Sequence, residues 1–408
     1  QYVELEKKSE KVVEFRLPEA NASLLKSLTT PILSKNQYIG ATLEEILEAD
    51  FPANRNPVGA GPFVLENIVL GGNGNSRVFL QKSDYFYKSV PYINDVVFSV
   101  SKDNTILIED AGVTACVNCK QAKNENFDNK EYQLPQYVGL FFNTESIWTQ
   151  HLSMRRGLSL GVDKSKLLSE NEGWTEINSP FFFSSPGNSS FSDSSAAVSS
   201  LIGGGFKWDA SIENRKKDEV PVLIKFIVPT LPPVFSRFAQ KIKKQWEDNL
   251  GINIELEILE TAEYLQALDD RAYDVVLTGM DFSGVSNMSA IWHSEQSSEF
   301  NLSNLTNDTI DSLVREYQIF GVSSDLNLLH QELEEIAAVL PLFTPNYEWF
   351  VSKKLKGVTQ NFKKLPHHSD RFWGIESWYF NEKKSWDIPI GKTKIGLFFQ
   401  FLFRSDDG

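Results

Sequence analysis

The clearest pattern of apolar and polar residues lies between residues 222 and 277. Val222–Val228 is an apolar run of strand length, and apolar residues then recur every four positions on a predicted helix that Gly251 closes: Val234, Phe238, Ile242 and Trp246. Alternation over 252–258 and an apolar run over 273–277 predict two more strands, with a helix over 262–270 between them. This order predicts an α/β fold in which parallel strands are joined by right-handed crossovers.

Further elements are predicted on both sides of this region. Tyr137–Phe142 is an aromatic-rich apolar run, typical of a buried strand, and it stops at Asn143 and a cluster of turn-forming residues. A helix follows around residues 152–160, and Asp163 is the predicted N-cap of a further helix. Two later helices are predicted over 308–320 and 325–340, the second with an apolar face that ends before Pro341: Leu329, Leu333, Ile336 and Leu340.

The first 100 residues carry turn and strand signals. Val12–Leu17 alternates like a strand, and Thr42 with Glu45 has the capping-box spacing of a short helix. Gly71–Asn75 is predicted as the loop of a hairpin between residues 64–70 and 77–81. Because a phosphate-binding loop needs a helix after it, we expect no nucleotide site here.

Length and charge limit the class of protein. A chain of 408 residues is long enough for two or three lobes. Its net charge of −14 argues against a nucleic-acid surface. The apolar stretch 395–403 is too short for a membrane-spanning helix, which needs about 20 residues. An edge strand or a loosely packed tail is expected there, with contact to a membrane surface as the alternative.

Candidate catalytic and metal-binding chemistry is sparse. The two cysteines, Cys116 and Cys119, form one Cys-x-x-Cys pair, which is compatible with a redox pair, half of a zinc site, a local disulfide or two spare thiols. For an extracytoplasmic protein we expect one of the last two. The five histidines join no serine-hydrolase or zinc-protease motif, so no catalytic residue, metal or cofactor is expected. Asp281 with Glu295 as a glycosidase pair remains the enzymatic alternative.

The predicted parallel strands point to a place for a ligand. Ligands of such sheets bind beyond the carboxyl ends of the strands, which here means Thr278–Phe282 and the loop that leads to Trp292, His293 and Ser294. Asp281 is suited to hold a ligand's α-amino group by a charge-assisted hydrogen bond, or it is a solvated loop aspartate. His293 either contacts the ligand or makes a structural hydrogen bond.

Several of these segments resemble one family. Tyr137–Asn143 followed by Arg155–Lys164 is similar to the signature of the extracytoplasmic solute-binding proteins of oligopeptide-, dipeptide- and nickel-type ABC importers (family 5). In that family a strand ending in Phe-Asn precedes a helix of the form Arg-x-Ala-Leu-Ser-x-Ala-x-Asp-Arg. Gly157 and Gly161 stand where the family usually has Ala, and each costs a helix roughly 1 kcal/mol. Residues 56–63 likewise resemble the family's Asn-Pro-Val-Gly-Thr-Gly-Pro-Tyr.

The resemblance implies a fold and a division of the chain. The implied fold is α/β and periplasmic-binding-protein-like (type II), with two lobes of mixed or parallel sheet flanked by helices and with hinge crossings near Pro135 and Tyr347–Val351. The chain would be N-terminally truncated. Its expected parts are the end of the small lobe, the large lobe, a second α/β lobe and a C-terminal tail, at residues 1–55, 56–136 with 351–380, 137–350 and 381–408.

It also implies a function and a ligand-binding set. The expected activity is capture of a peptide or similar small solute between closing lobes and its delivery to an ABC permease in the membrane, without catalysis. We expect an extracytoplasmic monomer, on the cell surface or in the periplasm, that is anchored through an N-terminal segment absent from this chain and binds no nucleic acid. A ligand sensor on the same scaffold is the other alternative. The expected ligand-binding residues are Asn143, Met280, Asp281, Phe282, Trp292 and His293.

Overall fold

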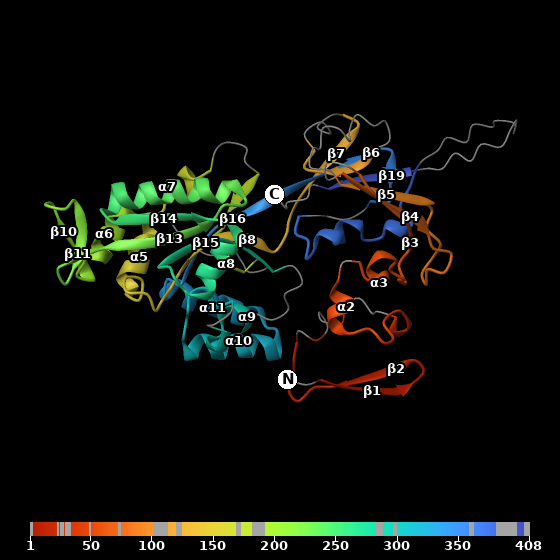
Figure 1. The fold of residues 1–408 in the computed structure, drawn as a ribbon, viewed down its shortest axis with the longest axis horizontal. Coiled ribbons are helices and arrows are strands. Elements are labelled where there is room, and N and C mark those ends of the chain that lie inside the picture. Colours follow the sequence, from red (N-terminus) through yellow and green to blue (C-terminus); the bar gives the residue numbers. More distant parts are fainter. Residues whose placement is uncertain are drawn as a thin grey trace, which may run out of the picture. The chain divides into compact units, whose positions relative to one another are not determined.

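The computed structural model describes most of the chain. The described residues are 3–22, 24, 28, 34–48, 50–71, 75–100, 113–119, 125–168, 173–181, 192–282, 289–296, 300–358, 363–380 and 398–403. They form two compact units (Figure 1). Unit 1 contains Gln1–Thr29 and Leu134–Pro345, and unit 2 contains Thr30–Gln133 and Asn346–Gly408. The lobe boundaries expected from the sequence stay a prediction.

The centre of unit 1 is a mixed sheet. Strands β13 (Leu223–Pro229), β14 (Asn253–Leu259) and β15 (Val275–Asp281) are parallel, in the order β14-β13-β15. Strand β8 (Gln136–Phe142) pairs antiparallel with β15, and the first part of β16 (Val339–Ser352) pairs antiparallel with β8. The parallel strands and the buried strand at 137–142 are therefore confirmed.

Helices cover both faces of this sheet (Figure 1). One core lies under α5 (Leu152–Leu160), α6 (Ser194–Gly203) and α7 (Pro233–Leu250), and the other contains residues of α8 (Thr261–Asp269), α9 (Ser289–Trp292), α10 (Asp308–Phe320) and α11 (Ser323–Glu335). Gly251 ends α7 at a φ of 67°, as predicted, since glycine adopts positive φ without steric cost. The helix over 308–320 is also confirmed.

The predicted helix over 325–340 is wrong at its C-terminal end. Helix α11 stops at Glu335, Ala337 has a φ of 49°, and β16 begins at Val339. Leu340 continues the spacing of the helical stripe, but its backbone pairs with Leu140 in the sheet. A strand pairing that links distant parts of the chain overrides the local helical pattern here.

The region after α5 also differs from its prediction. Asp163 precedes only a short 3-10 turn, Lys164–Lys166, and its carboxylate makes no capping bond to the backbone. The carboxylate instead accepts from the Ser165 hydroxyl at 2.5 Å and pairs with Lys166 at 2.8 Å. These interactions lower the pKa of Asp163, with the bond from Lys166 the largest cause. The predicted further helix is therefore reduced to one turn.

Unit 2 is built around antiparallel strands. Strands β3 (Phe63–Leu70), β4 (Ser76–Lys82) and β5 (Asp95–Val100) pair in sequence order, which confirms the predicted hairpin. Strand β6 (Val113–Val117) and strand β7 (Phe127–Gln133) both pair with the second part of β16. The predicted capping box at Thr42 and Glu45 is present at the start of α2 (Leu43–Leu47).

The apolar C-terminal stretch is neither an edge strand nor a loose tail. Its residues Phe398–Phe403 form β19, which pairs in parallel with β5 on one side and with β6 on the other. An internal position satisfies the backbone groups on both edges of the strand. The remainder of the predicted tail, apart from β19, lies outside the described residues.

Smaller elements complete the described chain. The two cysteines are buried free thiols, and a hydrogen bond with the Cys119 thiol is the main cause that raises the pKa of Cys116. The remaining helices and strands are β1 (Glu4–Ser9), β2 (Val12–Arg16), η1 (Lys35–Gln37), α3 (Pro52–Arg55), β9 (Trp174–Glu176), β10 (Lys207–Asp209), β11 (Asn214–Lys217), β12 (Val220–Pro221), η5 (Ser294–Gln296), β17 (Leu355–Lys356), η6 (His368–Phe372), η7 (Ile375–Ser377) and β18 (Tyr379–Phe380).

Candidate ligand-binding site

The carboxyl edge of the sheet in unit 1 presents an anchored carboxylate. Because β8 is antiparallel to β15, the first residue of β8, Gln136, lies opposite the last residue of β15, Asp281. The Gln136 side-chain amide donates to the Asp281 carboxylate at 2.8 Å, and the Phe282 amide donates to the Pro135 carbonyl at 2.8 Å. The hydrogen bond from Gln136 holds the Asp281 carboxylate in place. Asp281 is nevertheless exposed, so a ligand can reach this carboxylate.

Two stacked aromatic rings lie next to this carboxylate in the chain. The rings of Tyr137 and Phe282 are 5.7 Å apart between centroids and inclined by 15°. Both side chains are buried, and burial raises the pKa of the Tyr137 hydroxyl. Met280 is half-buried and pairs with Tyr137 in the sheet. The three predicted ligand residues Met280, Asp281 and Phe282 are thus consecutive residues at the carboxyl edge, backed by a rigid apolar layer.

Trp292 lies in the second core of unit 1. Its side chain is 1% exposed and is 6.2 Å from the Phe141 ring and 6.4 Å from the Phe181 ring, between centroids. Ligand contact would require this core to open, because a buried indole offers no surface to solvent. In this arrangement Trp292 packs the helices onto the sheet.

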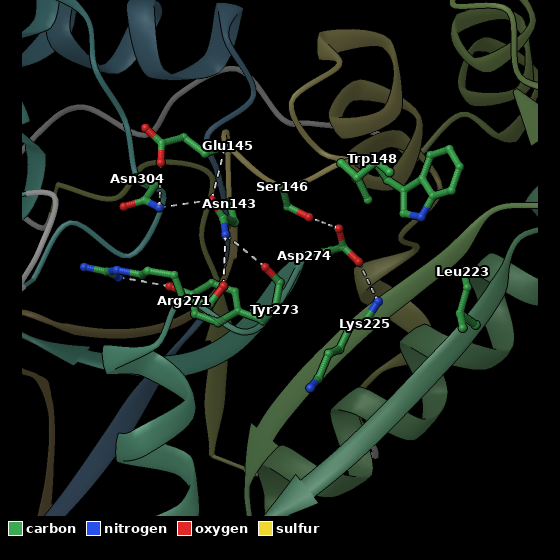
Figure 2. A pocket seen from close by; sticks show the side chains of 11 residues that line it. Asn143, Glu145, Ser146, Trp148, Leu223, Lys225, Arg271, Tyr273, Asp274 and Asn304 are labelled. Atoms are coloured by element: carbon green, nitrogen blue, oxygen red, sulfur yellow. Dashed lines mark hydrogen bonds between the residues drawn. The ribbon is translucent and has the colours of Figure 1, made fainter. Parts of the chain in front are cut away.

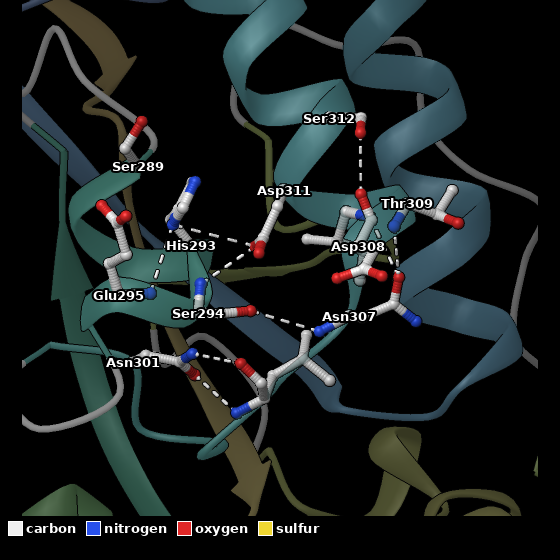
Figure 3. A network of polar contacts seen from close by, with 12 residues as sticks. Ser289, His293, Ser294, Glu295, Asn301, Asn307, Asp308, Thr309, Asp311 and Ser312 are labelled. Atoms are coloured by element: carbon white, nitrogen blue, oxygen red, sulfur yellow. Dashed lines mark hydrogen bonds and ion pairs between the residues drawn. The ribbon is translucent and has the colours of Figure 1, made fainter.

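His293 belongs to a polar network between α9 and α10 (Figure 3). Its Nδ1 accepts from the Glu295 amide at 3.2 Å and lies 3.9 Å from the Asp311 carboxylate, which also accepts from the Ser294 amide at 2.9 Å. The Ser294 hydroxyl in turn accepts from the Asn307 amide at 3.2 Å. These bonds hold the start of α10 and give His293 a structural partner on each side.

Asn143 lies at the opposite edge of the sheet from Asp281. Its neighbour Phe142 pairs with Val275, six residues before Asp281, which corresponds to about 20 Å along a strand. The Asn143 side chain donates to the Tyr273 carbonyl at 3.0 Å and is bonded by Asn304 (Figure 2). The structure therefore divides the six predicted ligand residues between different places.

The Asn143 edge carries its own cavity, of about 370 Å³ (Figure 2). Asp274 lines it and is 5% exposed. The Asp274 carboxylate accepts from the Ser146 hydroxyl and from the Lys225 amide, the latter at 2.7 Å. Burial raises the pKa of Asp274 despite these bonds. The carboxylate joins the loop after β8 to the start of β13, which is a structural role.

Sequence reasoning missed Gln136 as the partner of Asp281. The two residues are 145 positions apart, and only the antiparallel register of β8 and β15 brings them together. A strand prediction gives neither pairing direction nor register. The available signal was the position of Gln136 directly after Pro135 and before the apolar run.

Within the described ranges, no three His, Cys, Asp or Glu side chains are grouped so as to hold a metal ion. Among the helices of those same ranges, none combines the length and the apolar character that crossing a membrane requires.

Comparison with known protein families gives the class of this protein, which is a solute-binding protein. The model of the bacterial extracellular solute-binding proteins, family 5 (Middle), matches residues 1–301, and the chain belongs to this family. Its members are binding proteins and not enzymes, which confirms the expected lack of catalysis and leaves the glycosidase alternative without support. Membership also places the protein outside the cytoplasm, on the extracellular side or in the periplasm.

Solved structures share the periplasmic-binding-protein-like fold. The oligopeptide-binding protein AppA from Bacillus subtilis, in complex with a nonapeptide, is 18% identical with a TM-score of 0.69, and the match covers 93% of this chain and 78% of AppA. NikZ from Campylobacter jejuni in complex with Ni(L-His) is 18% identical with a TM-score of 0.70, covering 92% and 78%. Lactococcal OppA with an endogenous peptide is 14% identical with a TM-score of 0.68, covering 88% and 74%. No curated protein sequence matches the chain.

Proposed function

We propose that this protein captures a peptide, or a chemically similar small solute, and delivers it to the membrane permease of an ABC importer. Membership of the family 5 solute-binding proteins over residues 1–301 is the observation that carries the proposal. The solute binds at the carboxyl edge of unit 1, where Asp281 is exposed and held by Gln136. Two lobes close over it, and the closed form is favoured by the contacts that the solute makes with both.

The carboxylate at this edge favours a peptide over an uncharged solute. An exposed carboxylate attracts a ligand's α-ammonium group, and such charge-assisted hydrogen bonds are stronger than neutral ones. The rest of an extended peptide is bound through its main chain, which permits many side chains. AppA and OppA, which share this fold, were solved with a nonapeptide and an endogenous peptide. These observations support a peptide as the solute.

Native mass spectrometry of the protein purified without denaturation tests the identity of the solute. We expect a series of peptide masses to be retained by the protein and released on unfolding. Retention of a sugar or a metal complex, or of nothing at all, contradicts the peptide proposal.

The role of Asp281 is tested with one peptide in two forms, with a free and with an acetylated N-terminus. We expect the wild type to prefer the free form by about 10- to 100-fold, since a hydrogen bond to a charged group contributes about 1.5–3 kcal/mol. The Asp281→Asn variant should lose this preference, and Asp269→Asn, which changes an exposed carboxylate at the end of α8, should keep it. If the Asp281→Asn variant prefers the free N-terminus as strongly as the wild type does, another residue binds the ammonium group and the proposed role of Asp281 is contradicted.

We also propose that the protein acts as a monomer attached to the outer side of a membrane, next to its permease. The family's extracellular assignment supports this location. Fractionation of source cells and analytical ultracentrifugation test it: we expect the protein in the membrane-associated or periplasmic fraction and a monomer in solution. Recovery from the cytoplasm, or a stable dimer, contradicts this part of the proposal.

A further inference from the structure

A second cavity in unit 1 lies apart from the carboxyl edge. It has a volume of about 230 Å³ and is lined by residues of α5, α11, the turn after α5 and the first residues of β16. Strand β9 pairs with β16 only from Phe343 to Pro345, so the cavity lies beside the part of β16 that β9 leaves uncovered. None of the six predicted ligand residues lines it.

Lys164 is the buried charged residue in the lining of this cavity. Its side chain is 4% exposed, and its ammonium group donates to the Ile177 carbonyl at 2.7 Å and to the Asn178 side-chain oxygen at 2.9 Å. Both partners are neutral, and within the described ranges no carboxylate lies within 4.0 Å of the ammonium nitrogen. An ammonium group has three hydrogens, so one of them remains for a further acceptor. Buried charges are normally paired.

A buried hydroxyl lies in the same lining. The Ser159 hydroxyl is excluded from solvent and has no hydrogen-bond partner among the residues that the structure describes. A buried polar atom without a partner costs free energy comparable to a lost hydrogen bond. A ligand that accepts a hydrogen bond would satisfy both Ser159 and the third hydrogen of Lys164.

The rest of the lining is mostly apolar. Val162, Leu333 and Val339 are buried side chains that face the cavity together with Leu160, Leu340 and Pro341. The other ionisable groups in the lining are Arg156, His330 and Glu334, and Glu176 lies close enough to act on the charge of Lys164. The apolar part of the lining thus favours a ligand with an aliphatic chain, and the buried ammonium group of Lys164 favours a ligand with an anionic group.

We propose that this cavity binds a short aliphatic monocarboxylate, with its carboxylate on Lys164 and Ser159 and its hydrocarbon chain against Val162, Leu333 and Val339. The volume fits this class of ligand. An apolar cavity of about 150 Å³ holds benzene, so about 230 Å³ holds roughly eight to ten non-hydrogen atoms. The cavity lies wholly in unit 1, and the proposal is independent of peptide capture.

The test uses 4-methylpentanoate as the probe and 4-methylpentanamide as its neutral counterpart of the same shape. Dissociation constants are measured at pH 7 with the full chain by ligand-observed NMR titration. We expect the carboxylate to bind saturably, at least about tenfold more tightly than the amide. Equal binding of the two probes, or no saturation up to about 10 mM carboxylate, overturns the proposal.

Matched variants assign the binding to this cavity. Lys164→Met should abolish the preference for the carboxylate, and Ser159→Ala should weaken carboxylate binding by a few-fold. Lys241→Met is the control, because the Lys241 ammonium also donates to a backbone carbonyl, that of Leu167 at 2.7 Å, but Lys241 is absent from the cavity lining. A preference that survives Lys164→Met, or is lost with Lys241→Met, contradicts the assignment. The comparison of the two probes on the wild type decides the matter if a variant does not fold.

Discussion

Gly157 shows how the structure compensates for a departure from the family signature. A Cβ atom at Gly157 would lie 2.8 Å from both Cγ and Cδ2 of Leu201, which is 0% exposed, and 3.4 Å from the Ala197 carbonyl oxygen. The glycine in α5 is thus matched to a leucine in α6. We therefore expect Gly157→Ala to destabilise the protein, although alanine is the better helix former.

The magnitude follows from two opposing effects. Replacing a helical glycine by alanine contributes about 1 kcal/mol, whereas overpacking a core costs about 1–3 kcal/mol. The net expectation is a loss of up to about 2 kcal/mol in the free energy of unfolding. Gly203→Ala in α6 is the control, because nothing lies within 4 Å of the added Cβ, and it should be neutral or stabilising by up to about 1 kcal/mol.

Urea unfolding followed by tryptophan fluorescence measures these differences. Leu201→Ala alone should cost about 2–5 kcal/mol, and it should cost about 1–2 kcal/mol less when Gly157→Ala is present, because the added methyl group fills part of the space. Additive effects of the two substitutions, or a Gly157→Ala variant as stable as Gly203→Ala, would refute the reasoning.

Three further predictions concern single side chains. Burial is the main cause that lowers the pKa of Lys164 from 10.5 to about 8, so the folded state loses this proton at a lower pH than the unfolded state. The free energy of unfolding, relative to that of Lys164→Met, should therefore rise by about 3 kcal/mol between pH 8 and pH 10.5. Urea unfolding that gives the same difference at both pH values contradicts this prediction. Burial raises the pKa of Asp274. The stability of the protein relative to Asp274→Asn should therefore fall as the pH rises from about 4 through the raised pKa of Asp274. Thermal unfolding that shows the opposite trend contradicts this prediction. Thr42→Ala removes the hydroxyl that accepts a hydrogen bond from the Glu45 amide, and it should destabilise α2 by about 1 kcal/mol. The Glu45 amide should then exchange its hydrogen faster with solvent, whereas Thr42→Ser should keep the slower exchange of the wild type.

Elements with a strong local pattern could be predicted from the sequence. The repeat from Val234 to Trp246, closed by Gly251, predicted α7, and the flanking apolar runs predicted the parallel strands. The end of α11 could not be predicted, because Leu340 fits the helical stripe and only its pairing with Leu140 makes it part of a strand. Local patterns therefore specify elements well, whereas their ends depend on distant pairing.

The site was less predictable than the elements, for the same reason. The sequence predicts Asp281 as a ligand-binding residue because ligands bind at the carboxyl ends of parallel strands, and this stays a prediction. Asn143 was grouped with Asp281 because of the sequence resemblance to the family. Such a resemblance carries no information on the strand register that separates the two residues. The cavity around Lys164 combines residues from 156 to 341, and no pattern along the chain marks such a set.

We propose above all that the protein binds a peptide and leaves it unchanged. Isothermal titration of the protein with a nonapeptide, followed by mass spectrometry of the peptide recovered after incubation, is the decisive experiment. We predict saturable binding of one peptide per chain and recovery of the intact peptide. An absence of saturable binding, or recovery of cleaved or modified peptide, would contradict the claim.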